Sequence, residues 1–451
     1  MSSSSFSGLT DALSALNSAR YALDVTGQNI ANANTPGYVR QRAELAETGA
    51  VPAVPSMYAT PNASNTATVS GTSRLNDPVV DMRARSEHGR NGYLQTSATT
   101  LNAVEGLFDE PSSNGLAEKL NTFWQSWAAV ANNPGDSAAR NVVLQNATGL
   151  TSDLNETAQS LARLTQGTGQ QLTDAVDQIN TAATALAQLN NSIAVNSASG
   201  GNNNALLDQR DTLLMNLADL AGAQASIQPN GTATVTLGGQ SLVSSTTAST
   251  VSIGAGNQIL VGGTPAAAAG GSVQSLVDAL NTTLPNYTAQ LDAVAAALAN
   301  TTNAAQAGGY DLAGNPGGPL FSGSTAATIS VAVTDPTKLA ASGTPGGNLD
   351  GSVALSMSGY GNLPAGADSA YQTMIGALAT DVQRAGQQAT VQQSVTTSVD
   401  NLAQSSSGVS LDEETTNLLT YQRAYQASSR VLTTVDETLD TLISHTGRVG
   451  L

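Results

Sequence analysis

The C-terminal segment carries the most regular apolar repeat in the chain. One seam recurs every seven residues, at Leu418, Tyr425, Leu432 and Leu439. A second seam keeps the same interval, at Tyr421, Ser428, Val435 and Leu442. Two such positions per heptad predict an α-helix that packs lengthwise against another helix. A run of about 25 residues would form a rod about 37 Å long, and with Ser in its seam it needs a partner to be ordered.

The N-terminal segment has a related stripe. Its apolar residues fall at alternating three- and four-residue steps, at Phe6, Leu9, Leu13, Leu16, Leu23 and Ile30. This spacing predicts a second coiled-coil-type helix. We expect it to end near Asn34, because Pro36 disfavours the helical conformation in the residue before it. Both ends of the chain are therefore expected to order fully only against partners.

Most of the intervening chain also has helical periodicity. Long helices are predicted from about 76 to 221, with Asp136 as an N-cap after a Pro–Gly break. Another is predicted at 272–304, and heptads return from Ala367. In this last helix one heptad position recurs at Tyr371, Leu378, Ala385 and Gln392.

Two internal stretches have β character instead. Ala233, Val235 and Leu237 alternate with threonines between turn-forming residues, which predicts a strand, and β character continues to about 263. A further strand is expected around Ile329 and Val331, after a Gly/Pro-rich stretch at 308–324.

These patterns predict a mainly α fold with small inserted β modules. We expect an elongated multidomain protein, with a coiled-coil-like inner domain of terminal helices, a long-helix bundle and an outward β domain. The expected domains are a terminal helical domain of 1–40 plus 408–451, a long-helix bundle of 41–221 plus 272–304 and 365–407, and a small β-rich outer module of 222–271 plus 305–364.

Composition excludes several kinds of chemistry. The chain has no cysteine, which excludes disulfides, zinc–thiolate sites and a cysteine nucleophile. Its 33 acidic and 16 basic residues give a formal charge of −17, which disfavours binding to nucleic acid or anionic lipid. No stretch approaches the roughly 20 apolar residues of a membrane span. The chain begins without a basic region before an apolar one, so we expect any export to use a route other than a cleaved signal peptide.

No set of residues indicates an enzyme, a metal site or a cofactor site. The densest acidic cluster, Asp412 to Glu414, directly precedes a heptad helix, where acids favour the helix dipole. Asp208, Arg210 and Asp211 are interpreted as a solvated face or as ion pairs to an adjacent helix, and His88 as part of a solvated basic turn. We therefore expect no catalytic residues, no metal ligands and no cofactor.

Two segments are more specific than these patterns. Residues 28–41, with the core Asn29-Ile30-Ala31-Asn32-Ala33-Asn34-Thr35-Pro36-Gly37-Tyr38, resemble the N-terminal signature of the bacterial flagellar rod, hook and hook-associated axial proteins. Residues 409–414 through 422–427 resemble the C-terminal signature of the same family. Segments at 133–140, 203–211 and 335–342 further resemble the hook-associated branch of the family.

The resemblance implies a structural component of the flagellum that assembles at the distal end of the hook, at the hook–filament junction, and supports filament growth. It implies secretion through the flagellar type III apparatus and self-assembly in the axial structure beside the hook protein and a second junction protein. It also implies an export chaperone of the FlgN type on the C-terminal helix.

The resemblance further implies which residues take part in assembly. In the N-terminal signature they are Asn29, Ile30, Asn32, Asn34, Thr35, Pro36, Gly37 and Tyr38. In the C-terminal seam they are Leu418, Tyr421, Tyr425, Leu432, Val435, Leu439 and Leu442. The chain departs from many relatives in having only Gly/Pro-rich linker where they carry an extra β domain before Ile329.

Three alternatives remain open at this point. The chain could be another axial protein, namely a hook, distal rod or second junction protein. A Ser/Thr/Asn-rich surface adhesin is a rival from another class, although adhesins of such composition usually show repeated strands. An exported enzyme is third, and it lacks a catalytic constellation.

Overall fold

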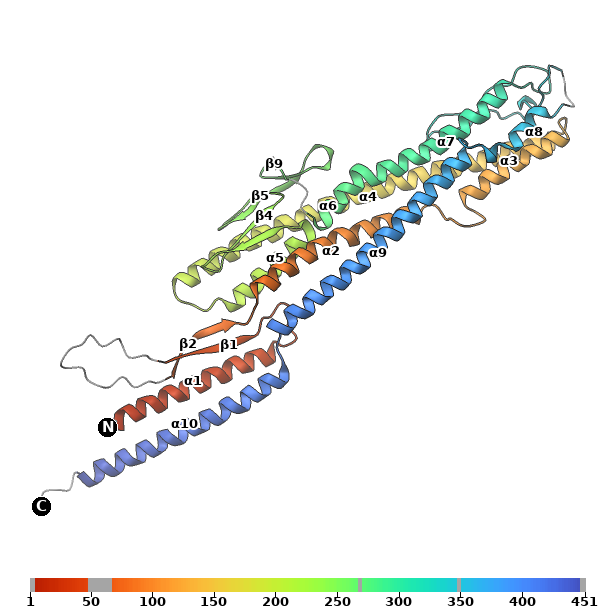
Figure 1. The fold of residues 1–451 in the computed structure, drawn as a ribbon. Helices are drawn as coiled ribbons and strands as arrows, with labels where there is room; N and C mark the ends of the chain where they lie inside the picture. The colour runs from red at the N-terminus through yellow and green to blue at the C-terminus, as the bar shows by residue number, and fades with distance from the viewer. Residues whose placement is uncertain (1–4, 48–66, 267–269, 347–349, 447–451) are drawn as a thin grey trace.

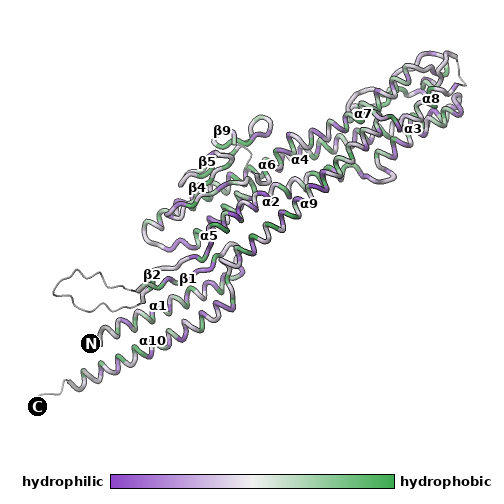
Figure 2. Tube along the Cα trace, viewed as in Figure 1, coloured by the Kyte–Doolittle hydropathy of each residue, from purple (hydrophilic) through white to green (hydrophobic). Residues whose placement is uncertain are grey.

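The computed structural model describes residues 5–47, 67–266, 270–346 and 350–446 and shows an elongated, mainly helical molecule (Figure 1). The helices are α1 (Ser5–Ala31), α2 (Pro78–Glu105), α3 (Leu116–Asn132), α4 (Ser137–Ala198), α5 (Asn204–Ala221), α6 (Gly271–Asp278), α7 (Leu284–Ala307), α8 (Ser352–Ser358), α9 (Ala367–Ser407) and α10 (Leu411–Thr446). The predicted class, a mainly α fold with small inserted sheets, is confirmed. Figure 2 shows hydrophobic and hydrophilic residues alternating along the long helices, as expected for helices with one packed face.

The strands are short and form four small sheets. They are β1 (Gln41–Glu47), β2 (Ala67–Arg74), β3 (Gln224–Ile227), β4 (Ala233–Leu237), β5 (Gln240–Ser244), β6 (Thr247–Ala248), β7 (Val251–Ile253), β8 (Ile259–Val261), β9 (Thr264–Pro265), β10 (Phe321–Ser322) and β11 (Ser330–Val331). The sheets have the orders β1-β2, β3-β4-β5-β6, β7-β8-β9 and β10-β11, and all pairs are antiparallel.

Helix α4 is the longest element and organises the body of the molecule. Its 62 residues span about 93 Å at 1.5 Å per residue. The Asp136 carboxylate accepts from the backbone N–H of Ala138 at 2.8 Å, which confirms the predicted N-cap. One apolar stripe runs along the helix and is buried from Val143 to Ile193. The helix therefore supplies one wall of a continuous core.

Helices α9 and α2 pack antiparallel over much of their length (Figure 1). The predicted heptad position of α9 is buried at all four residues, Tyr371, Leu378, Ala385 and Gln392. The predicted helix at 272–304 forms as α6 and α7, joined by a π-helical turn at Ala279–Thr283. Pro285 lies just after this turn, in the first turn of α7.

The two larger sheets are attached to α4 through asparagine side chains. The Asn190 amide donates to the carbonyl of Ala233 at 2.7 Å and accepts from its N–H at 2.9 Å. Asn180 makes the same pair of bonds to Val251, at 2.9 and 2.7 Å. Each amide thus pairs with a strand edge as another strand would, which fixes the module on the helix.

Residues 305–364 were expected to join this β module, but the structure places them at the far end of α7, away from it (Figure 1). Among the described residues of this segment, the only strands are the two-residue β10 and β11, and α8 was not expected. Asn303 of α7 makes two hydrogen bonds to the backbone of Phe321, and Asn155 of α4 donates to the carbonyl of Ala326. Side-chain amides of long helices therefore satisfy this backbone, so no larger sheet is needed.

The two ends of the chain form a separate layer. Helices α1 and α10 lie antiparallel, and the β1–β2 hairpin lies on α1, where Tyr21 Oη and Thr72 Oγ1 are 2.6 Å apart (Figure 1). We call α1, β1, β2 and α10 the inner unit. Among the described residues, the large apolar core of the body contains no residue of the inner unit. The inner unit must therefore be held on the body mainly by polar contacts.

Candidate assembly site

Helix α1 ends at Ala31 and is followed by the turn that carries the N-terminal signature. Gly37 has a φ of +78°, and a Cβ at this position would lie 2.7 Å from Thr212 Oγ1 of α5. Glycine is required here both by the left-handed conformation and by the close approach of α5. The turn redirects the chain from α1 into β1.

The other signature residues differ in exposure. Asn29 is buried at 1% exposure, and Ile30, Asn32 and Tyr38 are half-buried. Asn34, Thr35 and Pro36 are exposed. The signature therefore has one buried member that packs inside the chain, together with a solvent-facing turn.

Asn29 holds the inner unit together. Its amide N–H donates to the carbonyl of Gln41 at 2.8 Å and to Glu414 Oε2 of α10 at 3.1 Å. Its carbonyl oxygen accepts from the backbone N–H of Gln41 at 3.0 Å and from the Tyr38 hydroxyl at 2.8 Å. Both polar atoms of one buried amide are thus used to join α1, β1 and α10.

Glu414 is the acidic partner of this cluster, and Arg40 is its cation. Arg40 Nε donates to Glu414 Oε1 at 2.7 Å, and Arg40 Nη1 lies 2.5 Å from Glu413 Oε2. The Glu414 side chain is only 2% exposed. Burial lowers the pKa of the Arg40 guanidinium, but its hydrogen bonds to the two glutamates outweigh that effect and raise the pKa overall. The acidic start of α10 therefore does more than favour the helix dipole, because it also anchors β1.

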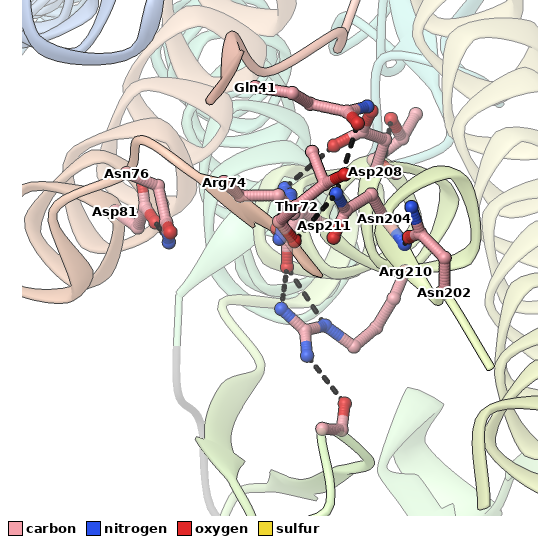
Figure 3. A network of polar contacts seen from close by, with 12 residues as sticks. Gln41, Thr72, Arg74, Asn76, Asp81, Asn202, Asn204, Asp208, Arg210 and Asp211 are labelled. Atoms are coloured by element: carbon pink, nitrogen blue, oxygen red, sulfur yellow. Dashed lines mark hydrogen bonds and ion pairs between the residues drawn. The ribbon is translucent and has the colours of Figure 1, made fainter. Parts of the chain in front are cut away.

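A second polar cluster joins the inner unit to α5 (Figure 3). Arg74 Nη2 of β2 lies 2.8 Å from Asp208 Oδ1 and 2.7 Å from Asp211 Oδ2. Asn204 donates to Gln41 Oε1 at 3.0 Å and to the Thr72 carbonyl at 3.3 Å. Asp208 and Asp211 were interpreted as part of a solvated face or as ion pairs to an adjacent helix; both acids form ion pairs, but with Arg74, which lies on a strand.

The two clusters are continuous. Gln41 belongs to both, since its backbone bonds Asn29 and its side chain bonds Asn204. Burial, followed by the charges of Asp208 and Glu414, raises the pKa of Tyr38 to about 12. We call this connected set the polar joint.

The polar joint extends as far as the β module. Arg210 of α5 lies 2.7 Å from Asp211 Oδ1 and donates to the carbonyl of Gly231 at 2.5 Å, in the turn before β4. Burial raises the pKa of Asp208, and Arg74 counteracts part of that rise. Polar contacts therefore lead from α10 through the inner unit to the turn before β4, and Figure 3 shows the part around Gln41, Arg74 and Arg210.

The predicted seam of α10 faces α1 of the same chain over part of its length. A Cβ at Gly8 of α1 would lie 4.0 Å from Val435 Cγ2. The half-buried seam residues are Leu418, Tyr421, Leu432, Val435 and Leu439. Tyr425 is 37% exposed, and the side chain of Leu442 lies outside the described residues.

The face of α1 that contacts this seam differs from the predicted stripe. Its fully buried apolar residues are Ala12, Ala19, Ala22 and Val25, while Leu13 is 49% exposed. Small residues let the two helices approach closely, and the leucines then flank the contact. The side chain of Phe6 lies outside the described residues. Apolar residues also remain exposed on α10, namely Leu411, Leu419, Val431 and Ile443.

Sequence reasoning missed several residues of the polar joint. Arg40, Gln41, Arg74 and Asn204 were not singled out individually, because nothing in their local pattern signals a distant partner. Two of them, Arg40 and Gln41, follow the N-terminal signature directly. Among the described residues, no group of three or more His, Cys, Asp or Glu side chains could hold a metal ion.

Comparisons with known proteins identify the family. Residues 101–321 match the family model described as the helical domain of the flagellar hook-associated protein FlgK. Residues 9–38 match the flagella basal body rod protein family, and 401–444 match the C-terminal family of the flagellar basal body rod FlgEFG proteins. The flagellar hook-associated protein 1 of Bacillus subtilis is 28% identical over 519 aligned residues, covering 99% of both chains. The chain belongs to the flagellar hook-associated protein 1 (FlgK) family.

A second relative agrees with this assignment, and a solved structure shares the fold. The hook-associated protein 1 of Salmonella typhimurium is 30% identical over 70% of this chain, which spans 59% of that relative. The solved structure of the flagellar hook junction protein FlgK from Burkholderia pseudomallei has the same fold, with a TM-score of 0.64, 19% identity, and coverage of 73% of this chain and all of that one.

Family membership makes this chain a structural protein of the flagellar hook–filament junction and a self-assembling component of the axial structure. The polar joint contains residues of three motifs that the sequence shares with the family, namely both terminal signatures and the 203–211 segment. In the part of the chain that the structure describes, no helix has the length and apolar character needed to cross a bilayer.

Proposed function

We propose that the chain caps the distal end of the hook and that its inner unit is the part that assembles there, in the wall of the axial tube. The observation that carries this proposal is the antiparallel pairing of α1 and α10, held by the bond between Asn29 and Glu414. It brings the N-terminal and C-terminal family signatures into one rigid unit. The role is mechanical and needs no catalytic step.

The surface of the inner unit supports its use in assembly. Leu13 is half-exposed on α1, and Leu419 and Val431 are half-exposed on α10. Each would be buried if further copies packed side by side against the helix pair, which favours association. The signature turn and the C-terminal seam then act together, the turn by fixing α1 and the seam by holding α10 on it.

The finer assignments follow from the same proposal. The hook protein and a second junction protein are the neighbours along the axis, and a FlgN-type chaperone covers the C-terminal helix before export. Export proceeds through the flagellar type III apparatus, without a cleaved signal peptide. The inner unit belongs to a terminal domain of 1–40 plus 408–451, to which the β1–β2 hairpin is added, and the remaining helices and sheets form the outward body.

Deleting the gene in the source bacterium tests the proposal. The expected result is bare hooks on the cell surface, seen by electron microscopy, with flagellin monomers lost to the medium. Re-expression of the intact chain should restore filaments. Normal filaments in the deletion strain would contradict the proposed role.

A further inference from the structure

Three arginines of α2 gather around one cleft in the body of the molecule. Arg83, Arg85 and Arg90 line a cleft of about 1070 Å³ between α2, α6 and the start of β3. The chain has only 16 lysines and arginines against 33 acids, so three cations within eight residues form a local excess of positive charge. Within the described residues, no carboxylate lies within ion-pair distance of any of the three.

The acidic residues of this cleft already have other partners. Glu87 Oε2 accepts from the Gln392 amide at 2.7 Å. Asp278 accepts from the Tyr93 hydroxyl at 2.9 Å and from the Gln274 amide at 2.8 Å. The carboxylates are thus bonded to neutral donors, and the guanidinium groups keep their donors free for an incoming anion.

Arg85 is the least exposed of the three arginines. It is half-buried, and burial lowers its pKa, while the more distant charges of Asp211 and Asp81 oppose that change. A guanidinium that is partly removed from water is stabilised most by a carboxylate that accepts two parallel N–H···O hydrogen bonds from it. Met82 at the same cleft is 58% exposed, so a partner that covers the arginines would also bury apolar surface.

We propose that this arginine cleft receives an acidic turn of α4 from a second copy of the chain, at Asp174 and Asp177. Both residues are exposed, one helical turn apart, and no cation lies within ion-pair distance of them in the described structure. Asp174 accepts only from the neutral Gln170 amide at 2.9 Å. Opposite charges on two surfaces of one chain favour an ordered contact between copies and fix its register. The inference rests on the proposed self-assembly.

Charge exchange in the deletion strain tests the inference. Arg83→Glu with Arg90→Glu should lower the fraction of hooks that carry filaments by about tenfold or more, because acidic residues then face each other across the contact. Asp174→Arg with Asp177→Arg should do the same. The chain with all four substitutions should restore filaments, because the positive and negative charges have then changed places across the contact. Arg163→Glu, at an exposed arginine of α4 outside the cleft, is the matched control and should leave filaments unchanged.

The alternatives give different results. Filaments that persist with Arg83→Glu and Arg90→Glu overturn the inference. A loss that the fourfold exchange does not reverse also overturns it, and calorimetric titration of the purified chain with inorganic phosphate then shows whether the cleft binds a free anion instead. Circular dichroism checks that each variant folds. If the intact chain itself fails to restore filaments, the proposed function fails, independently of the cleft.

Discussion

Asn29 and Glu414 lie 385 positions apart in the sequence, yet their side chains are hydrogen-bonded at 3.1 Å. Both residues are buried, each at 1% exposure. This one contact closes the chain on itself, because it joins the end of α1 to the first turn of α10. The integrity of the inner unit therefore depends on a few buried polar groups, and several measurements follow from that.

Replacing Asn29 with Ala should loosen the inner unit. It removes the donor to Glu414 and both bonds to the Gln41 backbone, and unsatisfied buried groups cost about 1–3 kcal/mol. Hydrogen exchange of α1 and α10 amides should accelerate accordingly, while α4 amides stay protected. The matched control is Asn32→Ala, since the Asn32 amide donates to the Gln28 carbonyl and accepts from the Thr35 hydroxyl, and both bonds are local and exposed. Equal protection in both variants would count against the role of Asn29.

Arg40→Met should destabilise the inner unit more than Glu414→Gln does. The first change leaves the nearly buried Glu414 carboxylate without its cation, which costs about 3–5 kcal/mol. The second removes the charge and keeps an oxygen that can accept from Arg40 or Asn29. The double variant Arg40→Met with Glu414→Leu should have a stability closer to that of the unmodified chain than Arg40→Met alone has. Hydrogen exchange of α10 measures all three, and the opposite order of the single variants would refute this assignment.

His88 should make stability depend on pH. Its Nδ1 lies 3.1 Å from Asp219 Oδ1 and its Nε2 lies 3.0 Å from Asp400 Oδ1, so it links α2 to both α5 and α9. The pKa of His88 is raised from 6.5 to about 9. The hydrogen bond to Asp219 is the main cause, burial opposes it, and the hydrogen bond to Asp400 adds to the rise. Because the folded value is the higher one, this stabilisation is complete below pH 6.5 and is lost as the pH rises through about 9.

Urea unfolding of the chain and of His88→Gln measures this effect. The chain should lose stability between pH 6.5 and about 9 relative to the variant, by about 1 kcal/mol or less per ion pair, because the site is half-exposed. Parallel pH profiles for the two proteins would show that the ring is not charged in the folded state.

Leu432→Asp and Leu439→Asp should permit secretion and abolish assembly. Both leucines are half-buried in the seam between α10 and α1, so a carboxylate there would be desolvated and would open the helix pair. The measurement compares the amount of the chain in the medium with the number of filaments per cell. Thr433→Asp is the control, because Thr433 is exposed on the same helix. Normal filament growth in either leucine variant would refute the seam assignment.

Periodic features were predictable from sequence because they follow from local burial. The heptad of α9 and the N-cap at Asp136 needed only the spacing of apolar residues and the residue types at helix starts. The buried face of α1 was not predictable in the same way. Alanines pack there because the partner helix approaches closely, and only the partner's position reveals this.

Long-range polar contacts escaped sequence reasoning for a similar reason. His88 was interpreted as part of a solvated turn, yet it bonds two acids that lie far from it in the sequence. The partner of Asp208 proved to be Arg74, on a strand. The segment 305–364 has β-like residues, but asparagines of α4 and α7 satisfy its backbone, so its placement depends on helices that local patterns do not position.

Within the assembled junction, α1 and α10 of one chain should pair with each other. Gly8→Cys with Val435→Cys tests it cleanly, because the chain has no other cysteine and these two positions face each other. The variant is expressed in the deletion strain, and isolated hooks are oxidised and run on a non-reducing gel. Pairing of α1 with α10 within one chain should give a disulfide that leaves the chain at monomer mass. Disulfide-linked dimers or longer ladders would show that α1 and α10 pair between copies, and would contradict it.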